Sequence, residues 1–206
     1  MKDGETMNHN QILETFKNTL VEEANAIIDT IDLFGDEVVR AVELINKTSG
    51  KLIVTGVGKS GHIGEKMAAT LSSTGTPSFF MHSTEAMHGD LGMIESNDIV
   101  LCISNSGETQ EVLNIIPALK KRNIPLIALT RSHQSTLAKL CDVSLAYNYK
   151  EECDELHLAP TTSSTLTLAI GDALAVTLSI MKEFSTTDFY TFHPGGSLGK
   201  LLSKKE

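Results

Sequence analysis

LIVTG at residues 52–56 is followed at once by VGKSG at residues 57–61, and this junction decides the fold. The first segment is a short, continuous apolar run, which is typical of a buried parallel strand. The second segment supplies glycines where the chain must turn from that strand into the helix that the following residues predict. A strand, a glycine turn and a helix in this order form the first part of a βαβ unit.

The same alternation continues along the chain. Four further apolar runs are typical of buried strands, and helical stretches separate them. Right-handed crossovers are expected to join these strands into one parallel sheet. The sequence therefore predicts an α/β fold, a three-layer sandwich around a five-stranded, doubly wound parallel sheet. The predicted strands are 52–56, 78–82, 98–104, 125–130 and 142–147, and the helices after the first strand are 62–74, 108–122, 133–140 and 163–183.

Two amphipathic helices are predicted ahead of the sheet, at about 10–33 and 36–47. In the first, Leu13, Phe16 and Leu20 begin an apolar stripe with spacings of three and four residues. Such a stripe packs on the sheet or on a partner subunit, and both arrangements stay open. A single domain is expected over 1–206, with N-terminal helices at 10–48, the sheet at 51–147, and a C-terminal helix with a His-Pro-Gly-Gly tail at 163–206.

Composition and charge argue against several classes of protein. Hydrophobic residues make up 41% of the chain and charged residues 21%, as in an ordinary globular protein. The net charge of −9 argues against a nucleic-acid partner, which requires clustered Lys and Arg. No membrane span is expected, because we find no apolar run of about eighteen residues. Cys102 and Cys141 lie in apolar runs without metal-ligand spacing, which favours a reduced, cytoplasmic protein.

The glycines at 56–61 match G-x-G-x-x-G, a weak signature of dinucleotide binding. That site expects an acidic residue at the end of the next strand, where this chain has Met-His-Ser at 81–83. A P-loop requires a glycine five residues before Gly58, and that position is Ile53. An ordinary tight turn is the simplest alternative, but it leaves Lys59 without a role.

A second loop, SNSGET at 104–109, follows the third predicted strand and precedes a helix. Hydroxyl groups and free backbone N–H groups at a helix start bind anions, although Ser and Thr are also ordinary N-caps. One such loop without a nucleotide motif suggests a single phosphate, as on a sugar phosphate. Glu111 follows one turn into the helix, where an acid suits the helix dipole.

The other strand ends add acids and histidines. Glu152 follows the last strand, His193 lies on a Pro-Gly turn, and His82 and His88 follow the second strand. The histidines suit a ligand or a divalent ion, but no carboxylate spacing completes a metal site. Aldose–ketose isomerisation needs such groups: a base for proton transfer between C1 and C2, a group that opens the ring, and donors for the enediolate. Partial burial is expected to raise the pKa of Glu152, which would suit it as the base.

Four motifs, taken in order, resemble the sugar isomerase (SIS) domain of arabinose-5-phosphate isomerases. They lie at 56–94, 102–112, 158–176 and 192–200, and the resemblance covers about 13–202. It implies a flavodoxin-like parallel sandwich, a homotetramer and no organic cofactor. It also implies a phosphorylated sugar as partner and the interconversion of D-ribulose 5-phosphate and D-arabinose 5-phosphate.

The resemblance also assigns individual residues. Lys59, Glu111, Glu152 and His193 fall on catalytic positions. The roles that follow are Glu152 as base, His193 in ring opening, Lys59 at the enediolate oxygen and Glu111 in orientation. His82 also matches a position for an inhibitory divalent metal. The substrate-contacting positions are Gly58, Ser60, Gly75, Thr76, His82, His88, Ser104, Asn105, Ser106 and Thr109.

Two features depart from the family pattern. Members usually continue into paired cystathionine-β-synthase domains, whereas this sequence stops at Glu206, which leaves nucleotide or metabolite regulation open. The stretch 151–157 is also unusually acidic, which leaves the base and the sugar open. The alternatives are isomerisation of a hexulose or heptulose phosphate, a catalytically silent binding subunit, and a sensor in a transcriptional regulator. Acidic N-terminal helices argue against the last.

Overall fold

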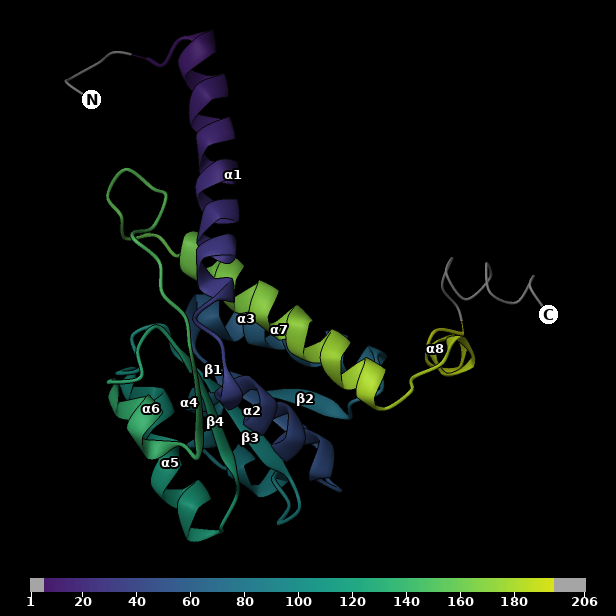
Figure 1. Ribbon diagram of the computed structural model, residues 1–206. Helices are drawn as coiled ribbons and strands as arrows, with labels where there is room; N and C mark the ends of the chain where they lie inside the picture. Colours follow the sequence, from purple (N-terminus) through teal and green to yellow (C-terminus); the bar gives the residue numbers. More distant parts are fainter. Residues whose placement is uncertain (1–5, 195–206) are drawn as a thin grey trace.

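The five strands of the sheet run parallel in the order β2-β1-β3-β4-β5 (Figure 1). A computed structural model describes residues 6–194. The predicted sheet is confirmed, and each predicted strand end lies within one residue of the observed one. The strands are β1 (Leu52–Gly56), β2 (Ser78–His82), β3 (Ile99–Ile103), β4 (Leu126–Thr130) and β5 (Val143–Ala146).

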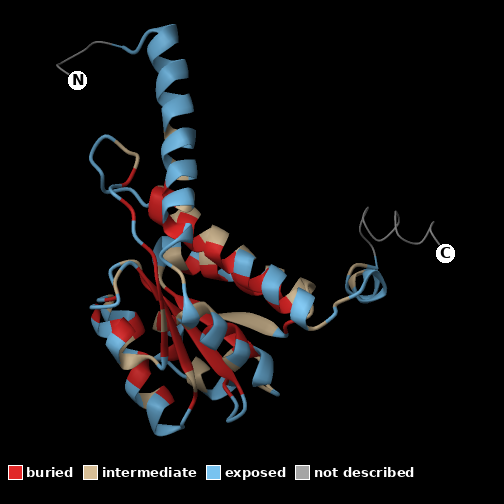
Figure 2. Ribbon diagram, viewed as in Figure 1, coloured by how far each residue is buried: buried red, intermediate tan, exposed pale blue. Residues whose placement is uncertain are grey.

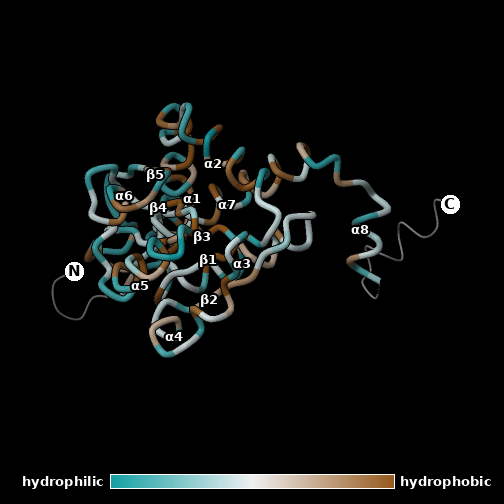
Figure 3. The backbone as a smooth tube through the Cα atoms, turned by 90° about the horizontal axis from the view of Figure 1, so that it is seen from below, coloured by the Kyte–Doolittle hydropathy of each residue, from teal (hydrophilic) through white to brown (hydrophobic). Residues whose placement is uncertain are grey.

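Helices cover both faces of the sheet, as a doubly wound arrangement requires. Figure 3 shows the strands nearly end-on, with α4, α5 and α6 on one side and α2, α3 and α7 on the other. The three-layer sandwich is therefore confirmed. The helices are α1 (His9–Ile31), α2 (Asp36–Lys47), α3 (Gly58–Ser73), α4 (Ser83–Ala86), the 3₁₀ helix η1 (Asp90–Met93), α5 (Gln110–Lys121), α6 (Thr136–Leu140), α7 (Thr162–Met181) and α8 (Thr186–Phe192).

Strand β3 lies in the centre of the core, and all its residues are buried. Successive side chains point to opposite layers. Leu101 packs in the cluster that includes Leu174 of α7, whereas Val100 packs in the cluster that includes Ile115 of α5. Because both faces of the strand are covered by helices, its sequence is apolar throughout rather than alternating.

The helices differ from prediction in two respects. Helix α3 begins at Gly58 rather than near residue 62, because Gly58 adopts φ +59° and lets the chain turn directly from β1 into the helix. The short helices α4, η1 and α8 were not predicted, since they contain too few residues to show an apolar period. Helix α8 forms in the expected polar tail, where a capping box between Ser185 and Asp188 starts it.

Helix α1 extends away from the sheet and is exposed along most of its length (Figures 1 and 2). Its buried residues are Ala26 and Thr30, near its C-terminal end, where α1 contacts α7. The predicted apolar stripe therefore packs on this chain's own body over a short part of its length. Its exposed large apolar side chains are Ile12, Leu13, Phe16, Leu20, Val21, Ile28 and Ile31.

Helix α7 is the one helix within residues 6–194 that is long and apolar enough to span a membrane. Residues 162–181 include Asp172 and several Ser and Thr and are not a continuous apolar run, so the expectation of no membrane span stays a prediction. Core helices meet the same criteria, and α7 packs along α3 with Leu166, Leu174 and Leu178 buried. The helix is apolar on more than one side, since Val176 and Ile180 are exposed.

Replacing Leu101 with alanine tests the position of the core. Leu101 is fully buried in β3, so its truncation is expected to lower the free energy of unfolding by about 2–5 kcal/mol. Leu156 is 72% exposed and serves as the control, with an expected loss below about 0.5 kcal/mol on truncation. Urea unfolding at one protein concentration measures both. Equal losses in the two variants would contradict the assigned core.

Candidate active site

The carboxyl ends of β1 and β3 meet where the strand order reverses. From β1 the chain enters α3 on one face, and from β3 it enters α5 on the other. In doubly wound sheets this switch point opens a crevice that holds the ligand. The β1–α3 junction at 56–60 and the loop at 104–109 therefore form the candidate site.

Helices α3 and α5 both begin at this crevice without a side-chain cap. Their N-cap residues, Val57 and Thr109, make no side-chain hydrogen bond to the first turn. The neighbouring helix starts of α6 and α7 are occupied: Ser135 caps α6, and the Glu152 carboxylate accepts the Ser163 N–H of α7. Uncapped N–H groups at the positive end of a helix attract anions. The uncapped N-termini of α3 and α5 are therefore both open to one anionic ligand in the crevice.

The loop at 104–109 is held in shape by its own hydroxyl groups. Ser104 is buried, and its Oγ lies 2.8 Å from Thr109 Oγ1 and accepts a hydrogen bond of 3.0 Å from the Gly107 N–H. Ser106 is exposed and accepts the Glu108 N–H at 3.1 Å. Ser104 and Thr109 thus shape the loop, whereas Ser106 and the helix start face the crevice.

A narrow cleft of about 40 Å³ lies between the starts of α3 and α7. Lys59 and Ser60 enter it from α3, and Asn105 enters it from the β3–α5 loop. One water molecule takes up about 30 Å³ of liquid, so this cleft accepts one edge of a ligand rather than a whole pentose phosphate. Its lining residues are Lys59, Ser60, Ile63, Asn105, Pro160, Ser163, Ser164 and Thr167.

Glu152 lies directly behind the cleft and is only 6% exposed. Its Oε1 accepts a hydrogen bond of 2.9 Å from the Tyr149 hydroxyl. Its Oε2 accepts bonds from the Thr161 N–H at 2.8 Å, the Thr161 hydroxyl at 3.2 Å and the Ser163 N–H at 3.1 Å. The carboxylate therefore ties the β5–α7 connection to the first turn of α7.

The pKa of Glu152 is lowered, not raised, so the expected upward shift is wrong. Burial alone raises the pKa of this carboxyl, but hydrogen bonds from Ser163, Thr161 and Tyr149 together outweigh that effect. Donors that bond to the charged form stabilise it. Glu152 is therefore ionised at neutral pH, which makes it able to accept a proton but a weaker base than predicted.

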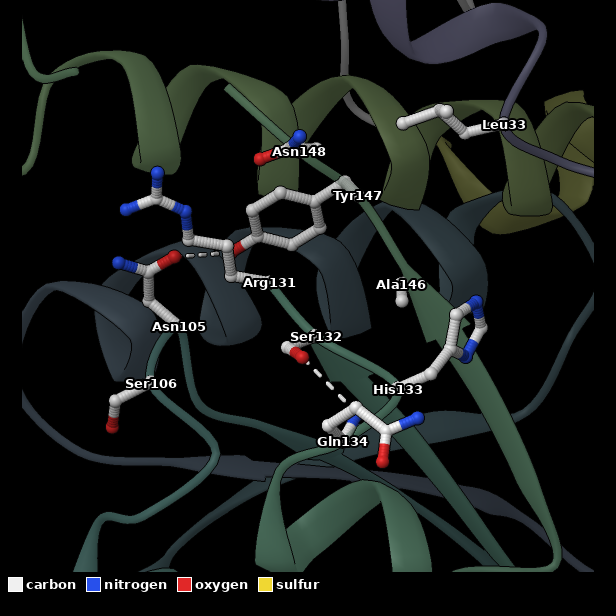
Figure 4. A pocket seen from close by; sticks show the side chains of 10 residues that line it. All are labelled: Leu33, Asn105, Ser106, Arg131, Ser132, His133, Gln134, Ala146, Tyr147 and Asn148. Atoms are coloured by element: carbon white, nitrogen blue, oxygen red, sulfur yellow. Dashed lines mark hydrogen bonds between the residues drawn. The ribbon is translucent and has the colours of Figure 1, made fainter. Parts of the chain in front are cut away.

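A wider cavity of about 650 Å³ lies beside the cleft, beyond the ends of β4 and β5 (Figure 4). Asn105 lines both spaces, and its Oδ1 accepts a hydrogen bond of 3.1 Å from the Tyr147 hydroxyl. The titratable groups of this cavity are Arg131, His133 and Tyr147. Lys59 and Glu152 do not line this wider cavity. We therefore assign the chemistry to the smaller cleft and regard the wider cavity as the path by which a ligand reaches it.

Gly75 and Thr76 lie in the turn between α3 and β2. This turn is at the amino ends of the strands, whereas the cleft is at their carboxyl ends. Gly75 adopts φ +92°, and a Cβ there would lie 2.5 Å from the Phe184 ring. Thr76 is buried and donates its N–H to the Leu71 carbonyl. Within one chain these two residues do not reach the cleft, and their substrate contacts stay a prediction.

The histidines and Glu111 are also outside the cleft. His82 ends β2, and its Nδ1 accepts the Thr84 N–H at 3.3 Å; His88 is exposed after α4. Glu111 is exposed in the first turn of α5. Within residues 6–194 no three His, Cys, Asp or Glu side chains are grouped to hold a metal ion, so the metal at His82 stays a prediction.

His193 ends α8, which lies beyond the far end of α7 and away from the switch point (Figures 1 and 3). Its ring stacks on Phe189 with centroids 4.0 Å apart, and its Nδ1 lies 2.8 Å from the Phe189 carbonyl oxygen. The glycines and following residues of the predicted His-Pro-Gly-Gly tail, 195–206, lie outside the described residues. In one chain His193 is therefore separate from Lys59.

Tyr149 is the site residue that sequence reasoning missed. Its hydroxyl joins Glu152 to Asn105, accepting the Asn105 Nδ2–H at 2.9 Å while donating to Glu152. Tyr147 and Tyr149 are two residues apart at the end of a strand, where period two places side chains on one face. Two tyrosines at this spacing after β5 were the available signal.

Comparison with known proteins establishes the family. The model of the SIS domain matches residues 44–177, and the chain belongs to this family. Arabinose 5-phosphate isomerase KdsD of Pseudomonas aeruginosa is 46% identical over 97% of this chain and 62% of its own length. The Yersinia pestis KdsD is 50% identical over 90% and 57%. The chain thus spans about three fifths of these relatives.

Solved structures give the same family. The Escherichia coli CFT073 protein c3406, in complex with arabinose 5-phosphate, is 47% identical with a TM-score of 0.89, covering 91% of this chain and 100% of that one. A putative sugar-phosphate isomerase from Listeria monocytogenes is 32% identical with a TM-score of 0.89, covering 92% and 100%. The predicted membership of the SIS family is confirmed.

Two glycine-to-alanine variants test the shape of the crevice loops. Gly58 and Gly107 both have positive φ, which costs about 1–2 kcal/mol for alanine. A Cβ on Gly107 would also lie 2.3 Å from the Ser135 Oγ, whereas one on Gly58 meets no atom within 4 Å. Gly107→Ala is therefore expected to lower the free energy of unfolding by at least about 1 kcal/mol more than Gly58→Ala. Chemical denaturation measures both, and equal losses would contradict the described packing at Ser135.

Proposed function

We propose that this chain is a sugar-phosphate aldose–ketose isomerase that interconverts D-arabinose 5-phosphate and D-ribulose 5-phosphate. The observation that carries the proposal is the pair of uncapped helix starts at the switch point, beside Lys59. These groups suit one phosphate and the charge that develops on an enediolate. The relatives named arabinose 5-phosphate isomerase, and the similar structure that holds arabinose 5-phosphate, support the choice of sugar.

The phosphate is placed at the start of α5, where Ser106 and the first backbone N–H groups of the helix are open. Lys59, in the first turn of α3, then faces the carbonyl end of the sugar across the cleft. A lysine cation at this position stabilises the enediolate oxygen in the transition state. The chemistry requires no redox partner, since a hydrogen moves between adjacent carbons of one molecule.

Glu152 is proposed as the group that moves the proton between C1 and C2. It is a carboxylate beside the cleft and is ionised at neutral pH. Its hydrogen bonds to Thr161 and Ser163 hold it in place. Glu152 does not line the cleft itself, but it accepts a hydrogen bond from Ser163, which does. Glu111, His88 and His193 are the competing groups, and among the described residues none of them bonds to a residue that lines the cleft. His88 or His193 from a neighbouring copy would reach it only in an oligomer.

A homo-oligomer, with a tetramer as the expected form, is the proposed assembly. The support is the apolar side of α1, where Phe16 and Leu20 are 65% and 55% exposed. An apolar hollow of about 240 Å³ between α1, α2 and α7 offers a matching surface. Burying large apolar side chains contributes about 1.5–3 kcal/mol each. A second copy is the partner that would cover these surfaces.

A reducing, cytoplasmic location is also proposed. The support is the state of the cysteines, since Cys102, Cys141 and Cys153 are all free thiols. Proteins exposed to oxidising compartments tend to pair their cysteines.

The activity is tested by NMR on the purified chain with a panel of aldose and ketose 5- and 6-phosphates. Conversion is expected for the pentose pair, with faster turnover than for any hexose or heptose phosphate. In Glu152→Gln, kcat is expected to fall by about 10²–10⁴, because the proton acceptor is lost, while KM stays within a few-fold. Exchange of solvent deuterium into the substrate should fall in parallel.

Two results would overturn these assignments. No conversion of any pentose phosphate by the wild-type chain would remove the proposed function. Near wild-type turnover in Glu152→Gln, with loss in Glu111→Gln or His193→Ala, would place the base elsewhere. The variant Glu43→Gln, in the last turns of α2, removes one negative charge away from the crevice and is the control for an unspecific charge effect.

The assembly is tested by light scattering at micromolar concentration. The mass expected is a multiple of 22.3 kDa, with four chains as the proposed number. Charges placed in the α1 stripe by Phe16→Glu with Leu20→Glu are expected to lower this mass, because a buried charge opposes association. A monomeric wild-type chain would contradict the proposal. Circular dichroism of the variant checks that the helices and sheet are retained.

A further inference from the structure

We propose that Tyr149 is a positioning residue whose hydroxyl group holds Glu152 and Asn105 in one fixed arrangement at the edge of the cleft. The inference rests on the proposed function, because it assigns Glu152 a part in proton transfer. It adds a residue that lies neither in the SIS motifs nor among the predicted site residues.

The first observation is the position of the Tyr149 hydroxyl. It donates to Glu152 Oε1 and accepts from Asn105 Nδ2, and both distances are 2.9 Å. Glu152 comes from the β5–α7 connection and Asn105 from the β3–α5 loop, so the hydroxyl joins two loops that are about 47 positions apart in the chain. Asn105 in turn lines the cleft with Lys59. The bridge is thus continuous from the carboxylate to the cleft wall.

The second observation is that the Tyr149 ring is itself held on several sides. The Arg131 guanidinium stacks over it, 4.2 Å from the ring centroid, and Arg131 Nη2 donates to the Tyr149 carbonyl oxygen at 2.8 Å. The Tyr147 ring stacks with it at a centroid distance of 6.3 Å. Tyr149 is only 7% exposed. Its hydroxyl therefore cannot swing away from Glu152 without disturbing these contacts.

The third observation is that Tyr149, and not Glu152, carries the proton of the hydrogen bond between them. Burial, together with the neighbouring Glu152 carboxylate, raises the pKa of Tyr149, although the bond from Asn105 opposes this. The hydroxyl stays protonated and acts as the donor, while the carboxylate stays charged. Asn105 has its other side-chain atom engaged, since its Oδ1 accepts from the Tyr147 hydroxyl. The amide orientation is thereby fixed as well.

The charged and titratable groups around this bridge come from four parts of the fold. Those on other elements are Glu22 and Asp29 of α1, which line the groove beside Tyr149, together with Arg131 and Lys59. Within residues 6–194, none of these four groups donates a hydrogen bond to the carboxylate oxygens of Glu152, whereas Tyr149 does. The groups on the connection itself, besides Tyr149 and Glu152, are Tyr147, Lys150, Glu151, Cys153, Asp154, Glu155 and His157.

The test compares Tyr149→Phe with the matched variant Tyr147→Phe. Both remove one tyrosine hydroxyl that bonds to Asn105, but only Tyr149→Phe removes the donor to Glu152. Carbon-13 NMR of labelled glutamate carboxyl groups follows the titration of Glu152, which is assigned by its absence in Glu152→Gln. In Tyr149→Phe the Glu152 titration is expected to move up by about one pH unit, the effect of one hydrogen bond to a charged group. In Tyr147→Phe it is expected to stay in place.

Kinetics then separate positioning from a purely structural role. In Tyr149→Phe kcat is expected to fall about ten- to a hundredfold with KM within a few-fold, because the carboxylate loses its fixed position. The midpoint of the acid limb in the profile of kcat against pH should move to higher pH, by the same amount as the NMR titration of Glu152. The substrate phosphate titrates at the same pH for every variant, so it does not contribute to differences between their pH profiles. An unchanged Glu152 titration, or a moved titration with unchanged kcat, would overturn the proposal.

The NMR titration needs no substrate, so it distinguishes this inference from the proposed function. If the wild-type chain converts no sugar phosphate but the Glu152 titration moves in Tyr149→Phe, the proposed function is rejected. The hydrogen-bonded arrangement of Tyr149, Glu152 and Asn105 is then retained. If Tyr149→Phe does not fold, 3-fluorotyrosine replaces all three tyrosines and strengthens the donor instead of removing it. The Glu152 titration is then expected to move to lower pH, and no movement overturns the proposal.

Discussion

The pairing of β1 with β3 is the constraint on which the rest of the structure depends. The two strands lie side by side in the centre of the sheet, and both are buried along their whole length. The chain leaves them toward opposite faces, because β2 and β4 lie on opposite sides of this pair. Helices α3 and α5 therefore start at one crevice. The site follows from the order of the strands rather than from any single motif.

Charge at this crevice is local, which explains how a chain with a net charge of −9 suits an anionic ligand. Two helix starts and Lys59 supply positive potential there. The nearby carboxylate of Glu152 keeps its charge, which is stabilised by its own hydrogen-bond donors, among them the Ser163 N–H at the start of α7. The start of α7 thus binds the Glu152 carboxylate of the protein itself, whereas the starts of α3 and α5 stay open for a phosphate.

A single chain presents only part of what the proposed reaction uses. The cleft of about 40 Å³ is lined by Lys59 and Asn105, while Thr76 and His193 lie elsewhere. The exposed apolar side of α1 indicates where another copy would pack. Assembly and catalysis are therefore proposed to be linked, because only a second copy would supply the residues that a single chain holds away from the crevice.

The sequence by itself determined the parallel sheet, since continuous apolar runs such as LIVTG specify strands buried on both faces. It also determined the crevice loops, because glycine and hydroxyl residues follow two of the predicted strands where helices begin. Only the tertiary structure decided the state of Glu152. Burial and hydrogen bonding shift the pKa of a carboxyl in opposite directions, and the donors that prevail here come from Tyr149, Thr161 and Ser163, whose positions around Glu152 the sequence does not reveal. Only the fold likewise placed Thr76 and His193 away from Lys59, because Thr76 precedes β2 at the amino ends of the strands and His193 follows α8, beyond the far end of α7.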